Sequence, residues 1–249
     1  MAEQDWTRAH HTRTDARALV WFVVFGDAPG DLRPSVRRHR VGHLPDAYDV
    51  VMVARGTRGF LDPREIVPRA LHADALLEAA SACDVQIVVR AELEDRADLL
   101  ELRSLVGLTT AIAEQASARA VLDAQTFALR SLEAWREEVF DVDAPRVGAH
   151  LLVMRSDEPD GAWLHTRGLR KFARPDLSMR GLAQNELDRA TEIVLRFAQL
   201  QIGGGVIAEG SEVRVHGWPP GWTCRHAGDL DDPDFNNTHV EITRTRRAP

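Results

Sequence analysis

A long apolar run, Ala18-Leu-Val-Trp-Phe-Val-Val-Phe25, constrains the fold of this chain more than any other feature. The run is far shorter than the roughly 20 residues that cross a bilayer, and a polar leader containing Asp5 and Asp15 precedes it. Its β-branched and aromatic residues favour a strand that is buried on both faces. We therefore expect a central sheet in a cytoplasmic protein, without a secretory signal or a membrane span.

The composition narrows the class of protein further. The 249 residues are 28% charged and carry a formal net charge of -7, which argues against binding driven by neutralisation of nucleic-acid phosphates. A chain of this length buries enough surface to fold without disulfides or a structural metal. Cys83 and Cys224 lie far apart and form no paired motif, so we expect two reduced thiols.

Hydrophobic periodicity predicts a mixture of strands and helices in the first half of the chain. The helix over residues 96–117 has the clearest support, because Leu99, Leu102 and Val106 recur at helical spacing. The expected strands cover residues 18–25, 49–54, 85–89 and 120–123, and two further helices are expected over residues 70–82 and 129–139.

The second half of the chain reads as a hairpin, a long helix and two closing strands. The expected strands cover residues 149–154, 162–166, 212–216 and 239–243, the helix covers residues 183–202, and residues 168–181 are expected to be irregular. Gly203-Gly-Gly205 is suited to ending the helix.

Together these elements predict an α+β fold with mixed or antiparallel sheets and helices packed on one face. We expect two similar-sized lobes: residues 1–16 form a flexible N-terminal tail, residues 17–143 an N-terminal α/β lobe, and residues 144–249 a C-terminal ββαββ-like lobe.

One segment of the second half is distinctive: Trp163-Leu-His-Thr-Arg-Gly-Leu-Arg-Lys-Phe172, followed by Arg174-Pro-Asp-Leu177. With Ala120–Thr126 upstream and Gly203–Gly210 downstream, it resembles an uncharacterised bacterial family, a domain of unknown function with the pattern T-x-G-L-x-x-F-x-x-P-(D/E)-L before a long helix. The resemblance covers roughly residues 84–216. It implies a bacterial protein and a fold but no reaction, so no catalytic residue is carried over.

The same segment contains the main candidate for a ligand site. Guanidinium groups and a nearby hydroxyl suit a carboxylate or a phosphate, and Gly168 permits close approach of a ligand to the backbone. The hypothesis is an anion or nucleotide-phosphate pocket; the alternative is a solvated loop whose arginines pair with the acidic excess. The candidate residues are His165, Thr166, Arg167, Arg170 and Lys171, with Asp123 from a neighbouring strand end.

Three other patterns contain residue types that bind metals. They are Cys224 and His226 with His216 and His239; Asp229, Asp231, Asp232 and Asp234; and His39 with His43. None has the ligand spacing of a known zinc or calcium module. We therefore expect no metal site and no cofactor.

Trp218 and Trp222 bracket Pro219-Pro220 in a glycine-bounded loop. If exposed, such a stiff apolar loop is suited to binding a partner protein; the alternative is a loop folded back onto the body. Because no catalytic motif is found, the prediction leans against an enzyme and towards a non-catalytic protein-interaction, regulatory or accessory component. The other possibilities are a small-molecule or anion-binding protein, or an enzyme, that uses the His165–Lys171 loop, and a homodimer paired through an open strand edge.

Overall fold

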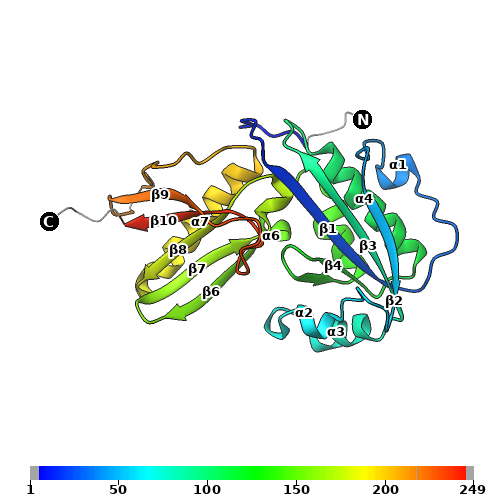
Figure 1. Ribbon diagram of the computed structural model, residues 1–249. Coiled ribbons are helices and arrows are strands. Elements are labelled where there is room, and N and C mark those ends of the chain that lie inside the picture. The colour runs from blue at the N-terminus through cyan, green and yellow to red at the C-terminus, as the bar shows by residue number, and fades with distance from the viewer. Residues whose placement is uncertain (1–5, 217, 245–249) are drawn as a thin grey trace.

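The computed structural model describes residues 6–216 and 218–244 of the chain. Two five-stranded sheets with helices packed on them form the molecule (Figure 1), which confirms the predicted α+β class. Within the described residues, no helix has the length and apolar character needed to cross a membrane.

The first sheet is antiparallel throughout, with β1 at its centre. In spatial order its strands are β2 (Asp49–Ala54), β3 (Val85–Glu94), β1 (Arg17–Gly26), β4 (Ala120–Asp123) and β5 (Ala128–Arg130). The apolar run predicted as a buried strand is β1, and it is buried along almost its entire length. The strands expected at residues 49–54 and 120–123 have the predicted bounds.

Helices cover both faces of the first sheet. Phe22 and Val24 of β1 join a buried cluster with α4 (Leu100–Gln115), whereas Val23 and Phe25 join a second cluster with α3 (Asp74–Ser81). Neighbouring side chains of a strand point to opposite faces, so α4 and α3 lie on opposite sides of the sheet. The shorter helices on this half are α1 (Val36–His39), α2 (Pro63–Ile66) and η1 (Arg69–Leu71).

The helix predicted over residues 129–139 begins later than expected. Residues 128–130 form β5, and the hydroxyl of Ser131 then accepts a hydrogen bond from the amide of Ala134 and starts α5 (Leu132–Trp135). A π-helical turn, η2 (Arg136–Phe140), continues from it. Trp135 packs edge-on against Phe22 of β1 and donates from Nε1 to the hydroxyl of Thr110 in α4, so α5 lies beside α4 on the same face of the sheet.

The second sheet is mixed, because β8 and β10 are parallel while its other paired strands are antiparallel. In spatial order its strands are β6 (Leu152–Glu158), β7 (Gly161–Arg167), β8 (Asp176–Leu182), β10 (His239–Arg244) and β9 (Trp222–Ala227). The long helix α7 (Leu187–Ile202) packs on β7 and β8 and ends at Gly203, as predicted. The remaining short helices are α6 (Val147–His150), η3 (Leu169–Phe172) and η4 (Gln184–Glu186).

Three predictions for the second half are wrong. Residues 168–181 are not irregular, because they contain η3 and the buried strand β8. Residues 212–216 make only an isolated bridge, from Glu212 to Thr223, and the strand in that region is β9. The order is therefore β-β-β-α-β-β rather than β-β-α-β-β. Both strands that were missed pair with β10, which is distant in sequence from β8 but directly follows β9.

The N-terminal segment packs onto the body from residue 6 onwards. Trp6 and Arg8 are buried, and the amide of His10 donates to the carbonyl of Gly203 at the end of α7. Residues 1–5 of the expected flexible tail lie outside the described residues. Residues 6–16 are not a flexible tail, because buried side chains and hydrogen bonds hold this segment on the body. The same large apolar cluster contains Trp6 and side chains from both sheets.

Candidate functional site

The predicted anion loop lies where the second sheet meets the first. Residues 165–167 end β7, and residues 169–172 form η3, which packs against β1. His165, Thr166, Arg167 and Lys171 are buried, and Arg170 is half-buried. The loop is therefore neither a solvated surface loop nor an open pocket.

Lys171 and Asp123 form a buried ion pair between the sheets. The ammonium group of Lys171 in η3 donates to Oδ2 of Asp123 at the end of β4, and Oδ1 of Asp123 accepts from the amide of Gln125. Burial lowers the pKa of Lys171, while the charge of Asp123 acts in the opposite direction. Asp123 does lie beside this loop, as the sequence predicted. The carboxylate of Asp123 and the ammonium group of Lys171 bind each other, where the hypothesis had both groups contact a ligand.

Other polar groups lie near this ion pair, among them the charged side chain of Arg130. His150 is buried against the ring of Phe172, and burial, together with the charges of Lys171 and Arg130, lowers its pKa well below the usual value. Within the described part of the chain, neither ring nitrogen of His150 has a hydrogen-bond partner, and the same holds for Nε2 of Gln125 and Oγ1 of Thr126. A neutral imidazole adds no positive charge, so the cations at this centre are Lys171, which binds Asp123, and Arg130, which binds the carbonyl of Ala149.

Thr166 and Asp176 form a second buried polar pair. The Thr166 hydroxyl donates to Oδ1 of Asp176 at 2.9 Å, and Nδ2 of Asn237 donates to Oδ2 at 2.8 Å. Burial raises the pKa of Asp176 to about 6, although these hydrogen bonds and that from the amide of Leu169 favour the charged form. Asp176 thus joins the start of β8 to η3 and to the loop before β10.

The two arginines of the predicted anion loop bind backbone oxygens of the chain itself. Nη1 of Arg167 donates to the carbonyl of Asp234 at 3.1 Å, and its guanidinium group stacks over the ring of Phe127. Nη1 of Arg170 donates to the carbonyl of Asn236 at 2.7 Å. Both groups therefore hold the acidic loop of residues 229–236 against η3, where the hypothesis placed an external anion.

His165 belongs to an aromatic cluster with Trp163, Phe235 and His239 on one face of the second sheet. Its ring stacks on Trp163 with centroids 3.9 Å apart and meets Phe235 edge-on at 5.4 Å, and Phe235 in turn stacks on His239 at 4.1 Å. Burial lowers the pKa of His165 to about 4. A neutral ring packed between aromatic groups is a core residue rather than an acid–base catalyst poised near neutral pH.

Gly168 allows a close approach, but the neighbour is the protein itself. Its φ is +120°, and a Cβ at this position would lie 2.3 Å from the carbonyl oxygen of His150 and 2.7 Å from Cγ2 of Thr126. The glycine therefore lets η3 pack against the end of α6 and the turn after β4, which fills the space proposed for a ligand.

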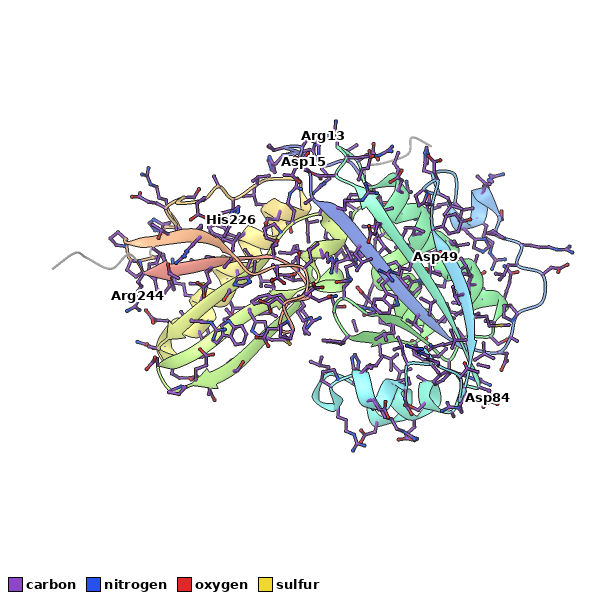
Figure 2. All side chains as sticks on the ribbon, in the orientation of Figure 1. Arg13, Asp15, Asp49, Asp84, His226 and Arg244 are labelled. Carbon is purple, nitrogen blue, oxygen red and sulfur yellow. The ribbon has the colours of Figure 1, made fainter. Side chains whose placement is uncertain are left out.

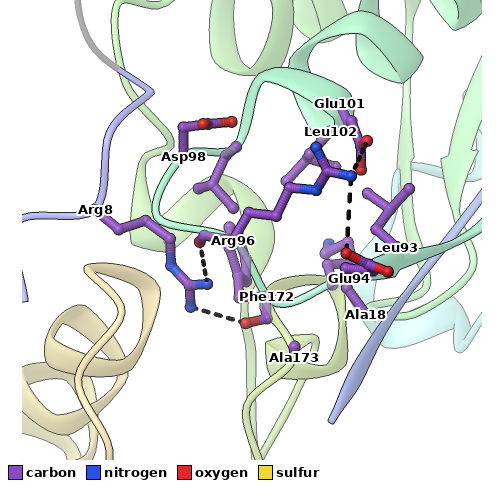
Figure 3. A pocket seen from close by; sticks show the side chains of 12 residues that line it. Arg8, Ala18, Leu93, Glu94, Arg96, Asp98, Glu101, Leu102, Phe172 and Ala173 are labelled. Atoms are coloured by element: carbon purple, nitrogen blue, oxygen red, sulfur yellow. Dashed lines mark hydrogen bonds and ion pairs between the residues drawn. The ribbon is translucent and has the colours of Figure 1, made fainter. Parts of the chain in front are cut away.

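A second buried charge cluster, formed by Arg8, Asp95 and Arg174, was not predicted. Asp95 accepts from Arg174 at 2.8 Å and from Arg8 at 2.5 Å; burial alone would raise its pKa, yet Arg174 and Thr14 bring it below the usual value. Arg8 also donates to the carbonyl of Phe172, as Figure 3 shows. The three residues are far apart in sequence, so no local pattern could have identified them.

Three cavities lie beside the predicted anion loop and the cluster of Arg8, Asp95 and Arg174. The crevice in Figure 3 encloses only about 10 Å³. Cavities of about 370 and 310 Å³ lie beside Arg174 and Pro175, a size that suits small molecules. Arg170 binds Asn236, and the guanidinium group of Arg174 is saturated by backbone oxygens and Asp95. Oε1 of Gln201 and Nδ1 of His239, which line the cavity of about 310 Å³, have no hydrogen-bond partner among the described residues.

The tryptophan loop is folded back, as the alternative interpretation had it. Trp218 and Trp222 are 8% and 2% exposed and lie against each other with ring centroids 5.3 Å apart. The partner-binding hypothesis for these two residues required exposed rings, and it is wrong for that reason. Gly217 lies outside the described residues.

The metal-ligand patterns do not come together in space. In the described ranges, no three His, Cys, Asp or Glu side chains form a group that could hold a metal ion. The carboxylates of Asp229 and Asp232 instead accept from the amides of Asp231 and Asp234 in tight turns. Cys83 and Cys224 are free and buried, and burial raises the pKa of Cys224 to about 11.

The feature best suited to contact another molecule is the outer edge of β2. This strand ends the order of the first sheet, and its apolar side chains are open to solvent: Val50 is 36%, Val51 50% and Met52 59% exposed. Figure 2 marks Asp49 at the start of the strand. The sequence predicted this strand correctly but contained no signal that its edge would remain unpaired.

Comparisons with protein-family models, with curated proteins and with solved structures found no match, so the resemblance to a bacterial family of unknown function stays a prediction and the site rests on geometry alone.

Proposed function

We propose that this chain is a non-catalytic protein-interaction component of the bacterial cytoplasm, and that it binds another protein chain along the edge of β2. The observation that carries the proposal is the exposure of an apolar strand whose outer backbone groups have no strand partner among the described residues. Such an edge is a template for one more strand.

The other sheet edges are protected in ways that β2 is not. β5 has only three residues, and β6 carries Arg155, Asp157 and Glu158. The segment at residues 210–213 hydrogen-bonds along β9. Proteins commonly protect strand edges by such shortness, charge or cover. β2 reads Asp-Val-Val-Met-Val-Ala and pairs with β3 without a bulge, so its outer edge stays straight, apolar and open.

The contacts of the predicted anion loop also support an interaction component over an enzyme or an anion-binding protein. Lys171, Arg167 and Arg170 are each bound to groups of the chain itself, and the ring of His165 is packed among aromatic side chains. Their arrangement favours a structural role for this loop over the alternative of an enzyme or an anion-binding protein.

Photo-cross-linking in the host cell tests the proposal. A photoreactive amino acid is placed at Val51 or, as a control, at Leu195, which is 39% exposed on α7. We expect a covalent product with position 51 only, and its loss when Met52→Lys is added, because a lysine on an edge strand disfavours pairing. Absence of a product at position 51, or equal products at both positions, contradicts the proposal.

A further inference from the structure

The hydrogen-bonding direction of each β2 residue follows from one contact beyond the strand. The amide of Arg55 donates to the carbonyl of Asp84 at 2.7 Å, which continues the β2–β3 register. In an antiparallel pair, alternate residues turn their backbone groups towards the partner strand. Asp49, Val51 and Val53 therefore face β3, and the N–H and C=O groups of Val50, Met52 and Ala54 point outward.

These three outward-facing residues are arranged symmetrically about Met52. If a second β2 approached antiparallel on a two-fold axis at Met52, Val50 would lie opposite the partner's Ala54, and Met52 opposite the partner's Met52. The Met52 pair exchanges two backbone hydrogen bonds, as in any antiparallel ladder. In each Val50–Ala54 pair the amide of Ala54 donates to the carbonyl of Val50, whereas the carbonyl of Ala54 already accepts from the amide and the hydroxyl of Thr57 in its own chain. The strand is thus self-complementary in its backbone, which is what an isologous interface requires.

The charges at the ends of the strand select the same register. Asp49 is exposed at one end and Arg55 follows the other end, and the two-fold pairing places Asp49 opposite the partner's Arg55 twice over. The side chain of Arg55 is 36% exposed, although it already lies 3.6 Å from the carboxylate of Asp84 in its own chain and donates to the carbonyl of Cys83. The partner's Asp49 would therefore share this guanidinium group with Asp84. Opposite charges that face each other across a strand pair are favourable. A register shifted by two residues would instead place Asp49 opposite the partner's Val53.

The apolar side chains of β2 would pack against each other in such a pair. Val51 and Val53 would meet the partner's Val53 and Val51 on one face, and the exposed Met52 pair would meet on the other. Building on the proposed function, we propose that the chain held at this edge is β2 of a second copy, paired antiparallel about Met52 to give a ten-stranded sheet across a two-fold dimer.

Light scattering on the full chain tests the stoichiometry. We expect a mass of twice 27.7 kDa for the wild type and for Leu195→Lys, and a mass of 27.7 kDa for Met52→Lys. The circular dichroism and melting temperature of each variant show that it is folded. A wild-type mass of 27.7 kDa at every concentration overturns the self-pairing.

Disulfide trapping tests the register. Val51→Cys and Val53→Cys copies, each with a different affinity tag, are mixed and oxidised. The proposed register brings these positions to about 4.5 Å between Cα atoms, which fits a disulfide. We expect more covalent dimer in the mixture than in either variant alone; equal yields contradict the register. The wild type, with buried Cys83 and Cys224, serves as the control.

The two proposals fail in different ways. If the wild type is monomeric while Val51 cross-links to a different protein, the self-pairing is wrong and the interaction function stands. If the wild type is monomeric and Val51 cross-links to nothing, both proposals are wrong.

Discussion

The ammonium group of Lys171 in η3 donates to the carboxylate of Asp123 at the end of β4, and both side chains are buried between the two sheets. Each charge has lost its hydration and is compensated mainly by the other. The only lysine of the predicted anion loop therefore has an internal counter-charge.

Removal of one member of this pair is expected to be costly. We expect Lys171→Met to lower the free energy of unfolding by about 3–5 kcal/mol, because it leaves a buried carboxylate without a partner. The double variant with Asp123→Asn is expected to lose clearly less than the sum of the single losses. Urea unfolding of the four proteins measures this coupling.

An exposed ion pair provides the matched control. Arg196 and Glu192 are paired one turn apart on α7 and are both well exposed, so Arg196→Met is expected to cost under about 0.5 kcal/mol. If Lys171→Met costs no more than this control, the buried pair does not have the role assigned to it.

Asp176 is expected to make the protein less stable as the pH rises from about 4 to about 6. Its folded pKa of about 6 lies above the ordinary value of 3.8, so the folded state holds the proton more tightly. The stabilisation by protonated Asp176 is complete at a pH below 3.8 and is lost as the pH rises through about 6. The difference between the two pKa values corresponds to about 3 kcal/mol of unfolding free energy. The carboxyl ¹³C shift of Asp176 should titrate near pH 6; a midpoint near 4 would refute the assignment.

Two helical glycines are expected to respond oppositely to alanine. A Cβ on Gly107 in α4 would lie 1.7 Å from the carbonyl oxygen of His39, whereas nothing lies within 4 Å of a Cβ on Gly148 in α6. We expect Gly107→Ala to cost about 1–3 kcal/mol through overpacking, and Gly148→Ala to be neutral or to gain up to about 1 kcal/mol. Thermal unfolding compares them, and a stable Gly107→Ala would show that α1 moves freely away from α4.

Arg174 is expected to be irreplaceable by lysine. Its guanidinium group donates to Asp95 and to the carbonyls of Thr12, Gly204 and Gly205. These bonds join the N-terminal segment, the residue after β3 and the end of α7. An ammonium group cannot reach these acceptors together. We expect Arg174→Lys to cost more than about 3 kcal/mol, since each hydrogen bond involving a charged group contributes about 1.5–3 kcal/mol. Arg225→Lys, on an exposed part of β9, should leave the melting temperature unchanged; similar losses in both variants would contradict the assignment.

Local sequence patterns alone predicted three features of the fold correctly. The apolar run became β1, the spacing of Leu99, Leu102 and Val106 matched α4, and Gly203 ended α7 as expected. The apolar run and the helical spacing each predict a buried element, and the glycine predicts a helix end, so neighbouring residues suffice in all three cases.

The tertiary structure alone decided which polar groups have partners and which strand edge stays open. β8 pairs on one side with β10, far along the chain, and the charged or backbone partners of Asp123, Asp95 and Arg167 are supplied by segments more than forty residues away. The open edge of β2 likewise exists only because the sheet order ends there. A sequence records that a charge or a strand is present, but its hydration or pairing is settled only when distant segments fold together.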